Sequence, residues 1–351
     1  MPSKLEKKKM SEIIKFGIVG SGHIGKRHAA MVKNHPEAEL VAMCDINTAL
    51  KVPIQEEFND VPFFASMEEM LASGLEFDIL TICTPNYLHA TQSLQALEAG
   101  YHIVCEKPMA LKKADCEDML FKALQKNKLV FCVMQNRYSP PSKWLKEVLS
   151  SRALGKIYVV TINCFWNRDE RYYKKEGWKG KLAMDGGTLF TQFSHFIDIM
   201  FWLFGDIQNI QARFQDFNHQ ELTEFEDSGI ISFDFKKGGI GNINYSTSVW
   251  ESNQESSLTI VGSKGSIKVG GQYMEKVEYC NIENYEMPEL PPSNPPNQYK
   301  GYKGSAANHH YVIENVVDTL KGRSIATTNA LEGLKVVEII ENIYALKNQE
   351  S

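Results

Sequence analysis

Three glycines near the N-terminus have the spacing of a phosphate-binding turn. Gly20, Gly22 and Gly25 form a G-x-G-x-x-G pattern between an apolar run and a helix-like stretch. In such a turn the first glycine permits a tight bend and the second lets the backbone approach a pyrophosphate. The third lets the helix pack closely against the strand, and the positive end of the helix faces the anion. The pattern predicts a dinucleotide-binding turn that also contains His23 and Ile24.

An acidic residue downstream indicates which dinucleotide binds. Asp45 ends the next predicted strand, 20 residues after Gly25. A carboxylate at this place binds the ribose hydroxyls of the adenosine and repels a 2′-phosphate. The sequence therefore favours NAD over NADP as the cofactor. The alternative is a glycine turn followed by an unrelated acid, which would have to meet the strand–turn–helix context by chance.

A second segment, residues 166–181, mixes basic and aromatic side chains. Guanidinium groups bind carboxylates or phosphates in a bidentate manner, and aromatic rings stack on sugars and bases. The segment is therefore a candidate for binding an anionic, sugar-like substrate, with Arg168 and Trp178 among its contacts. The alternative is a solvated loop whose basic residues face water. The other basic and aromatic members are Trp166, Arg171, Tyr172, Tyr173, Lys174, Lys175, Lys179 and Lys181.

A strand–helix repetition positions the glycine turn. Short apolar runs without alternation are typical of parallel strands that are covered on both faces, and helical spacing of apolar residues separates them. The repetition predicts a doubly wound α/β domain, a Rossmann dinucleotide-binding domain, over residues 12–138. The predicted strands are Ile13–Val19, Leu40–Cys44, Phe77–Cys83, His102–Cys105 and Leu129–Met134, and the predicted helices are Ile24–Asn34, Ser66–Ser73, Tyr87–Ala99 and Lys112–Asn127.

The pattern changes after Pro140 and Pro141. Many of the later strands alternate apolar with polar residues, which is typical of an antiparallel sheet with one open face. Lys237 followed by two glycines is a hairpin signal. Residues 139–351 are therefore expected to form an α+β domain with a large, mainly antiparallel open sheet. Its predicted elements are strands Ile157–Phe165, Ile207–Gln215, Gly229–Phe235, Gly239–Tyr245, Ser257–Val261, Ser266–Val269 and Lys276–Cys280, helices Leu189–Leu203, Asn308–Leu320 and Ala330–Leu346, and an irregular loop Pro288–Gly304.

Composition excludes several classes of protein. The chain has 351 residues, of which 43% are hydrophobic and 23% charged, enough for two domains with sizeable cores. A net charge of −5 argues against binding nucleic acid or an anionic membrane by bulk charge. No apolar run approaches the roughly 18 residues of a spanning helix. The seven cysteines are expected to be buried, reduced thiols in a cytoplasmic protein, and residues 1–11 a disordered tail.

An ordered set of motifs resembles one enzyme family. The motifs are Thr84-Pro85-Asn86-Tyr87-Leu88-His89, Glu106-Lys107-Pro108, Gln135-Asn136-Arg137-Tyr138, Trp178-Lys179-Gly180, and Gly186-Gly187-Thr188-Leu189 followed by His195 and Asp198. In order and spacing, over about residues 12–348, they resemble the glucose–fructose oxidoreductase/inositol dehydrogenase/MocA family. The resemblance implies a nucleotide-binding domain and a sheet domain with the substrate between them. It also implies homodimers or homotetramers formed through the open sheet.

The resemblance implies roles for individual residues. It makes Lys107 the active-site lysine and His195 the general acid or base. A histidine can accept the proton of an alcohol while an ammonium stabilises the alkoxide, but Lys107 becomes the base if desolvation lowers its pKa. Taken singly, the two residues also fit an exposed turn lysine and a hydrogen-bonded helix histidine. The remaining implied contacts are Thr84, Pro85, Asn86, His89, Glu106 and Asn136 for the cofactor, and Arg137, Tyr138, Arg168, Trp178 and Thr191 for the substrate.

One position departs from the family pattern. Many members carry an aspartate four residues before the histidine, where this chain has Thr191. Threonine cannot act as a carboxylate base, and the missing negative charge suits an anionic substrate. With the basic segment, the motifs look like those of UDP-N-acetylglucosaminuronate 3-dehydrogenases, which serve polysaccharide biosynthesis. The alternatives are a dehydrogenase of a free sugar, sugar acid or inositol, and a catalytically silent dinucleotide-binding regulator.

Two further features concern the helices. Asp198 lies one helical turn after His195, so it either orients the imidazole or makes a separate polar contact. His309 and His310 begin a predicted helix, but no carboxylate or cysteine lies at ligand spacing from them. A structural or catalytic metal is therefore not expected.

Overall fold

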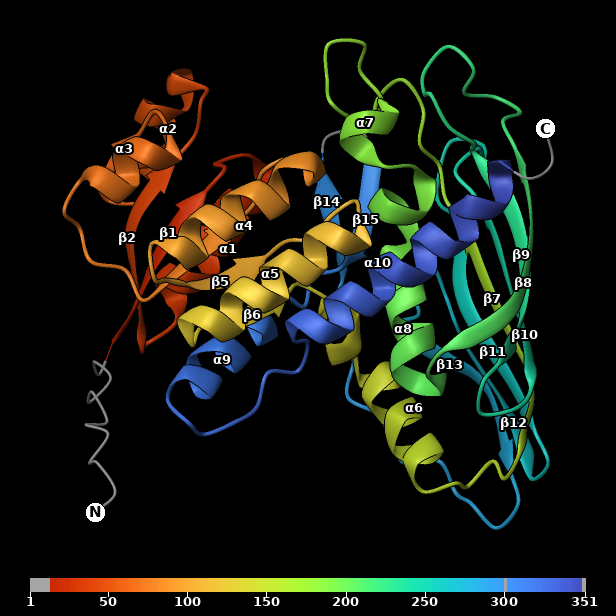
Figure 1. The fold of residues 1–351 in the computed structure, drawn as a ribbon. Coiled ribbons are helices and arrows are strands. Elements are labelled where there is room, and N and C mark those ends of the chain that lie inside the picture. The colour runs from red at the N-terminus through yellow and green to blue at the C-terminus, as the bar shows by residue number, and fades with distance from the viewer. Residues whose placement is uncertain (1–12, 300–301, 349–351) are drawn as a thin grey trace.

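The computed structural model describes residues 13–299 and 302–348, which form two lobes that are each built on one β-sheet (Figure 1). The tail expected at residues 1–11 lies outside the described residues. Within the described part, none of the helices combines the length and the apolar character that crossing a membrane requires.

The first sheet has six parallel strands in the order β3-β2-β1-β4-β5-β6. This order reverses between β1 and β4, which creates a crevice at the carboxyl ends of the central strands. The predicted doubly wound sheet is confirmed, with β3 as an additional short edge strand. The strands are β1 (Ile14–Val19), β2 (Ala38–Cys44), β3 (Phe63–Phe64), β4 (Ile79–Ile82), β5 (His102–Cys105) and β6 (Val130–Cys132).

Helices cover both faces of this sheet. In α1, the residues Gly25, His28, Ala29 and Val32 are buried, a spacing that places them on the one helical stripe facing the sheet. The helix starts directly after Gly22, so the glycine turn connects β1 to α1 as the sequence predicted. The helices are α1 (His23–Asn34), α2 (Lys51–Glu57), α3 (Met67–Ala72), α4 (His89–Glu98) and α5 (Lys113–Lys126).

The second sheet has seven strands in the order β13-β12-β11-β7-β10-β9-β8. Only its β7–β10 pair is parallel; the other neighbours are antiparallel, and β9 and β10 form the predicted hairpin. The mainly antiparallel sheet is thus confirmed. The strands are β7 (Ile157–Phe165), β8 (Ile207–Gln215), β9 (Ser228–Phe235), β10 (Ile240–Ser246), β11 (Glu255–Gly262), β12 (Gly265–Gly270) and β13 (Lys276–Ile282).

One face of the second sheet is covered and the other is not. On the covered face, Ile231 and Ile243 are fully buried and join the main core with Phe196 of α8. On the other face, Ile230 and Ile240 leave 61% and 56% of their surfaces exposed. The predicted open face is therefore present and carries apolar side chains. The covering segments are α6 (Pro140–Ser150), a π-helical turn η4 (Leu189–Phe193) and α8 (Ser194–Phe204), whereas α7 (Leu182–Asp185) contacts η2 (Asn86–Leu88) of the first lobe.

Two segments differ from the sequence expectation. Pro140 and Pro141 open helix α6 rather than merely marking a boundary, because proline is compatible with the first helical turn. The expected irregular loop Pro288–Gly304 contains most of a small hairpin, β14 (Pro296–Tyr299) and β15 (Tyr302–Ala306). Neither strand alternates in polarity, so no periodic signal marked them.

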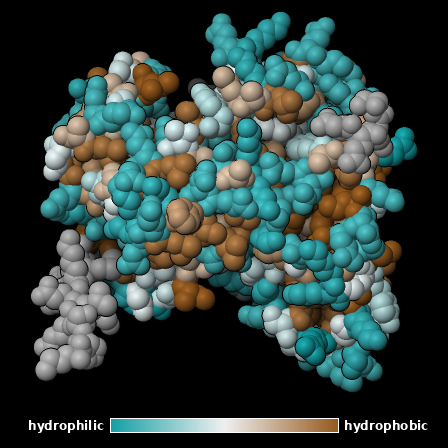
Figure 2. Space-filling view, viewed as in Figure 1, coloured by the Kyte–Doolittle hydropathy of each residue, from teal (hydrophilic) through white to brown (hydrophobic). Residues whose placement is uncertain are grey.

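The C-terminal helices tie the lobes together. The buried face of α9 (His309–Leu320), including Val312 and Val316, packs with Ile14, Phe16 and Phe131 of the first lobe. The sequence assigned this helix to the second domain, and its packing corrects that assignment. Helix α10 (Ala330–Ala345) contacts both α5 and α8, and Figure 1 shows it running between the lobes. The space-filling view shows this face as largely hydrophilic, with hydrophobic patches near its middle (Figure 2).

All seven cysteines are free thiols. Six are buried as predicted, and Cys280 is partly exposed because it lies on β13 at the edge of the second sheet. Burial raises the pKa of Cys44 to about 12, so this thiol stays protonated at neutral pH.

Candidate active site

The glycine turn after β1 has room for a pyrophosphate. Gly20 has a φ of +91°, and a Cβ there would lie 2.8 Å from the backbone of Cys83. A Cβ on Gly25 would lie 1.9 Å from the Gly20 carbonyl oxygen, so only glycine allows this close approach of helix and turn. A Cβ on Gly22 would have no neighbour within 4 Å, because this residue faces open space. The backbone at the start of α1 is therefore accessible to a ligand.

A cavity of about 810 Å³ lies over this turn. Asp45, at the end of β2, lines it and accepts hydrogen bonds from the backbone N–H groups of Ser21 and Asn47, at 2.7 and 2.8 Å. These bonds fix the carboxylate where it can meet ribose hydroxyls. The open glycine turn and the anchored acid together fit NAD. The cofactor residues expected from the sequence that line this cavity are Gly20, Gly22, His23, Ile24, Asp45, Thr84 and Pro85.

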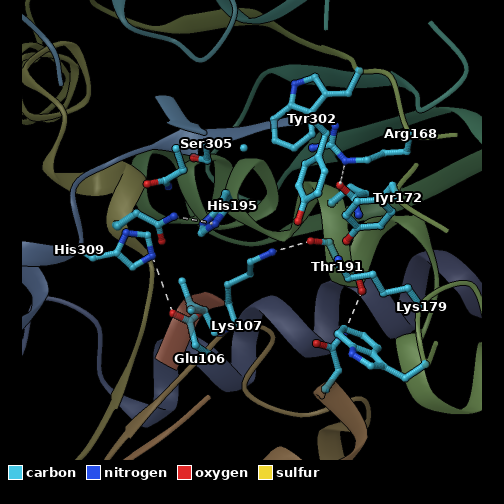
Figure 3. A pocket seen from close by; sticks show the side chains of 18 of the residues that line it. Glu106, Lys107, Arg168, Tyr172, Lys179, Thr191, His195, Tyr302, Ser305 and His309 are labelled. Carbon is cyan, nitrogen blue, oxygen red and sulfur yellow. Dashed lines mark hydrogen bonds and ion pairs between the residues drawn. The ribbon is translucent and has the colours of Figure 1, made fainter. Parts of the chain in front are cut away.

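A second cavity, of about 180 Å³, adjoins the first and is lined by residues of both lobes; Figure 3 shows side chains in its wall. The two cavities share five lining residues: Ile24, Thr84, Trp178, Lys179 and Tyr302. A ligand in the second cavity therefore adjoins one end of the cofactor cavity. The structure brings together in its wall the predicted residues Asn86, His89, Glu106, Lys107, Arg168, Trp178, Thr191 and His195.

Lys107 follows β5 and extends into the middle of this cavity (Figure 3). The peptide bond between Lys107 and Pro108 is cis. The Lys107 ammonium donates a hydrogen bond to the backbone oxygen of Thr191. Desolvation lowers the pKa of Lys107 to about 8, against the opposing effect of the Glu106 and Asp185 carboxylates. The side chain can therefore exist in both protonation states near neutral pH.

His195 lies on α8 above Lys107. Its Nε2 lies 3.2 Å from the amide nitrogen of Gln135, and its Nδ1 has no hydrogen-bond partner among the described residues. Burial, and then the charge of Lys107, hold the pKa of His195 well below its usual value. The imidazole is neutral at physiological pH, so it can exchange hydrogen bonds with a substrate but binds a proton poorly.

Arg168 is a buried cation with neutral partners. Only 2% of its surface is exposed. Its guanidinium donates to the side-chain oxygen of Gln192 at 2.7 Å and to the backbone oxygen of Lys303 at 3.1 Å. It also stacks against Trp166 and Tyr172, with its central carbon 4.8 and 5.2 Å from the ring centres. Aromatic stacking and amide oxygens hold this charge in place without neutralising it.

The rest of the basic segment divides into two groups. Lys179 lies 3.8 Å from the ring centre of Tyr172, and desolvation lowers the pKa of Lys179 to about 8. Lys179 thus belongs to the cavity. Arg171 instead pairs with Asp169 in an exposed position. The lysines at 174, 175 and 181 are also exposed, as the solvated-loop alternative predicted for them.

Asp185 is a carboxylate near the cavity that the sequence analysis did not select. It ends α7 and is fully buried. One of its oxygens accepts a hydrogen bond from the Thr191 hydroxyl and the other accepts from the backbone N–H of Gly180, at 2.8 Å. Burial raises the pKa of Asp185 to about 6. Asp185 lies six residues before Thr191, outside the helical spacing that defines the family pattern, so no motif marked it.

Glu106 supports the floor of the cavity. Its Oε1 lies 2.8 Å from Nε2 of His28 and 3.8 Å from Nε2 of His309. These three buried groups lie within 4.8 Å of one another, a clustering that could hold a metal ion and that the local spacing of His309 did not reveal. The absence of a metal remains a prediction. Burial opposes the ionisation of Glu106, but its hydrogen bond with His28 and its electrostatic interactions with the two histidines and Lys107 lower its pKa to about 2, so it is an ionised carboxylate.

His89 braces two turns of the site. Its ring nitrogens lie 2.7 Å from the backbone oxygen of Pro108 and 2.8 Å from that of Thr84. Thr84 in turn donates its hydroxyl to Gln92 at 2.6 Å. His89 therefore connects the turn after β4 to the turn that carries Lys107.

The structure corrects the expectation for Arg137. The motif Gln135–Tyr138 forms a 3-10 turn, so its successive side chains point in different directions. Gln135 faces His195, whereas Arg137 donates to the Asp198 carboxylate at 2.9 and 2.6 Å and to Glu332 at 2.9 Å. This ion pair is fully buried, away from both cavities. It also shows that Asp198 makes a separate polar contact rather than orienting the imidazole.

Two more expected contacts lie outside the cavities. Tyr138 stacks on Tyr311 with ring centres 5.8 Å apart, and neither cavity includes it. Asn136 accepts a hydrogen bond from the hydroxyl of Ser305 and likewise does not line them. Asn136 therefore contacts the β15 segment next to the site, whereas Tyr138 packs with α9 against the first lobe.

Several lining residues were not selected from the sequence. Tyr302 comes from the segment predicted to be irregular and Ser305 follows directly after that segment; no periodicity or motif marked either residue. Gln135 and Lys179 belong to two of the family motifs, and Tyr172 belongs to the basic segment. Their position next to selected residues was therefore the signal that could have identified them. The further lining residues are Trp166, Gln192, Asn297, Gly304 and His309.

Two solved structures resemble this chain over nearly its whole length, and a further known protein resembles about two thirds of it. WlbA dehydrogenase from Bordetella pertussis, in complex with NADH and UDP-GlcNAcA, is 30% identical, with 97% of this chain and 98% of that chain covered and a TM-score of 0.85. WlbA from Chromobacterium violaceum, with the same two ligands, is 31% identical, with 96% and 94% covered and a TM-score of 0.86. The D-glucoside 3-dehydrogenase of Escherichia coli (strain K12) is 27% identical over 248 residues, 66% of this chain and 69% of that protein.

Two family models also match. Residues 14–134 match the oxidoreductase family with an NAD-binding Rossmann fold, and residues 143–268 match the GFO/IDH/MocA C-terminal domain. These matches agree with the open glycine turn, the anchored Asp45 and the adjoining cavity that contains Lys107 and His195. The chain belongs to the GFO/IDH/MocA oxidoreductase family and is a dehydrogenase with NAD as its cofactor.

Proposed function

We propose that this dehydrogenase oxidises a secondary alcohol of an anionic sugar derivative, namely the 3-hydroxyl of a UDP-N-acetylglucosaminuronate-type nucleotide sugar. The observation that carries the proposal is the charge of the second cavity. Lys107, Arg168 and Lys179 line it, against the single carboxylate of Glu106. That carboxylate already faces His28 and His309. An anionic substrate therefore supplies the counter-charge that the cavity wall lacks.

The free-energy cost of burying a cation without a counter-charge supports this interpretation. A buried cation is expensive unless it is paired or hydrogen-bonded. Arg168 contacts only neutral acceptors, and desolvation lowers its pKa. Lys179 is held by aromatic rings. A carboxylate or phosphate entering between them gains charge-assisted hydrogen bonds to groups that are already oriented. The UDP-GlcNAcA in the two WlbA structures belongs to this chemical class.

The proton transfer assigns different tasks to the two central residues. When bound, NAD accepts the hydride from the carbon that bears the hydroxyl. General bases work best when their pKa lies near the operating pH. Lys107, with a pKa of about 8, meets this condition, whereas the pKa of His195 is far below it. We therefore assign the hydroxyl proton to the neutral amine of Lys107, and to His195 a hydrogen bond that orients the same hydroxyl.

A substrate panel tests the proposal. The purified protein is mixed with NAD and with UDP-N-acetylglucosaminuronate, neutral UDP-N-acetylglucosamine, free hexoses or inositols, and reduction of the nicotinamide is followed by absorbance. Reduction with the acidic nucleotide sugar, and not with its neutral counterpart, is expected. A 2-oxo acid is included in parallel to reoxidise any NADH that stays bound. Turnover confined to neutral sugars overturns the proposal.

The second candidate is a dehydrogenase of a free sugar or glycoside. The similarity to D-glucoside 3-dehydrogenase favours it, because that name also specifies oxidation at position 3. The same panel with a free glucoside added separates the two candidates, since the glucoside carries no charge for Arg168. If the protein binds NAD but oxidises none of the compounds in the panel, it is instead a regulator.

The open face of the second sheet supports a further part of the proposal. Exposed Tyr158, Ile230, Ile240 and Tyr279 project from its strands. We propose that this face forms a homodimer or homotetramer interface, because monomers rarely expose contiguous apolar patches. Light scattering on purified protein should give a multiple of the chain mass. The double charge substitution Ile230→Glu with Ile240→Glu should return it to a monomer.

A further inference from the structure

A carboxylate stands one hydrogen bond behind the cavity wall. Asp185 has no exposed surface and does not line either cavity. Its Oδ1 accepts from the hydroxyl of Thr191, a residue that does line the substrate cavity. The other oxygen is held by the backbone N–H of Gly180, at 2.8 Å. A buried acid with two fixed donors has one defined position relative to the site.

Thr191 connects this carboxylate to both lobes. Its hydroxyl lies 2.8 Å from the side-chain nitrogen of Asn86, which also donates to the backbone oxygen of Asp185 at 2.9 Å. Asn86 follows β4 of the first sheet, whereas Thr191 and Asp185 belong to the second lobe. The backbone oxygen of the same Thr191 receives the ammonium of Lys107. Thr191 therefore presents one atom to Lys107 and another to Asp185.

We propose that Asp185 is a positioning and specificity-determining residue, which compensates the charge of Lys107 from behind Thr191 and leaves the cavity wall at position 191 free of a carboxylate. This inference rests on the proposed function, because the advantage of a hidden acid depends on an anionic substrate. An aspartate at position 191 itself would place the same charge against that substrate. Moving it behind a threonine keeps the compensation and removes the repulsion.

The electrostatics agree with this geometry. Asp185 raises the pKa of Lys107 and thereby opposes part of the desolvation that lowers it. It acts on Lys179 in the same direction. Since burial places the pKa of Asp185 at about 6, its carboxylate is largely ionised at neutral pH. Removing its charge should therefore lower the pKa of Lys107 further.

The primary test is Asp185→Asn, which keeps the shape and the acceptor for Thr191 but removes the charge. The acidic limb of the kcat/KM profile is the rise with pH that follows deprotonation of Lys107. It should move to lower pH by about one unit, so that kcat/KM at neutral pH rises about fivefold because more of Lys107 is then neutral. Asp118→Asn, which removes an exposed carboxylate on α5, is the matched control and should leave the profile unchanged. If the acidic limb of the kcat/KM profile of Asp185→Asn coincides with that of the wild type, the proposal is overturned.

Variants of Thr191 test the hydrogen bond between its hydroxyl and Asp185. They also keep the proposal testable if Asp185→Asn does not fold. Thr191→Ser retains the hydroxyl and should keep the wild-type profile, whereas Thr191→Val should move the limb in the same direction as Asp185→Asn. Thr191→Asp should raise KM for the acidic nucleotide sugar about tenfold or more, and KM for a neutral sugar less. Equal effects on charged and neutral substrates overturn the specificity role.

The two proposals fail separately. Wild-type protein that turns over only neutral sugars rejects the proposed substrate. The pH limb of Asp185→Asn can then still be measured with whichever sugar is oxidised. A shifted limb with that sugar retains the positioning role of Asp185, and an unshifted limb rejects it. Melting temperature and NAD affinity are measured for each variant, so that a loss of folding is distinguished from a loss of compensation.

Discussion

The cofactor half and the substrate half of this site are built in different ways. The cofactor half depends on backbone geometry: residues 20–25 form a turn in which two positions exclude any side chain, and one acid follows at the end of the next strand. The substrate half depends on side chains from distant segments, such as Lys107, Arg168 and His195. A short contiguous motif specifies the first half, whereas only the folded chain assembles the second.

The charges of the two halves differ in the same way. Asp45 lines its cavity and is held by backbone N–H groups. In the substrate half, desolvation moves the pKa values of Lys107, Lys179 and Asp185 toward the neutral range, to about 8, 8 and 6. Burial thus turns ordinary residues into groups that titrate near physiological pH. The comparison indicates that cofactor binding rests on shape and that substrate chemistry rests on desolvated charge.

Removing the central amine should produce the largest effect. In Lys107→Met, kcat for oxidation should fall about 1,000-fold, because a positioned general base contributes about 100- to 10,000-fold. Wild-type kcat/KM should rise with pH until about 8, since Lys107 accepts a proton only after losing its own. The variant should lose this limb while NAD affinity, measured by fluorescence titration, stays unchanged. Lys175→Met, at an exposed lysine, is the control. If the rise of kcat/KM with pH persists in Lys107→Met and disappears in His195→Gln, the general base is His195.

The reverse experiment damages the cofactor half alone. Gly25→Ala places a Cβ 1.9 Å from the Gly20 carbonyl oxygen, so the turn must open. The strain should lower the free energy of unfolding by about 1–3 kcal/mol and weaken NAD binding by up to about 100-fold. In Gly22→Ala the added Cβ meets no protein atom, so stability should hold while the approach of the pyrophosphate is hindered. Equal melting temperatures for the two variants would contradict this division.

The features that the sequence predicts correctly are those that depend on neighbouring residues, as the cofactor half does. The parallel sheet, the glycine turn and Asp45 were predictable because each depends on neighbouring residues, and the hairpin at Lys237 depends on a local turn. The ordered motifs also located Lys107 and His195. Arg137 was misplaced because a motif names residues without giving their directions: in the turn at 135–138, one side chain faces the cavity and another faces Asp198.

Asp185 and Tyr302 show what local reasoning could not supply. Asp185 reaches Thr191 because the chain turns between α7 and η4 at two glycines with positive φ, at positions 186 and 187. Tyr302 enters the cavity from a hairpin that has no polarity pattern. Helix α9 was assigned to the wrong lobe because its apolar stripe specifies that it is buried, but not against which sheet. These features depend on long-range packing.

Two arginines three residues apart allow a finer test of the substrate half. Arg168→Met should raise KM for the acidic nucleotide sugar about 30-fold, which corresponds to about 2 kcal/mol for a hydrogen bond to a charged group. Arg171→Met, in the same segment, removes an exposed arginine already paired with Asp169 and should change KM less than about twofold. Steady-state kinetics with acidic and neutral sugars measures both. A similar effect of the two substitutions would mean that the whole segment acts through its net charge.

The smallest expected effect concerns the choice between the two dinucleotides. Asp45→Asn keeps a hydrogen-bonding side chain but removes the charge that opposes a 2′-phosphate. NAD affinity should fall about tenfold, as expected for the loss of one charge-assisted hydrogen bond, and the preference over NADP should narrow. Because Asp45 lies outside the substrate cavity, kcat at saturating NAD should stay within about twofold of wild type. A large loss of kcat would show that the two halves are coupled. The distinction between a cofactor site set by shape and a substrate site set by buried charge would then apply to binding but not to turnover.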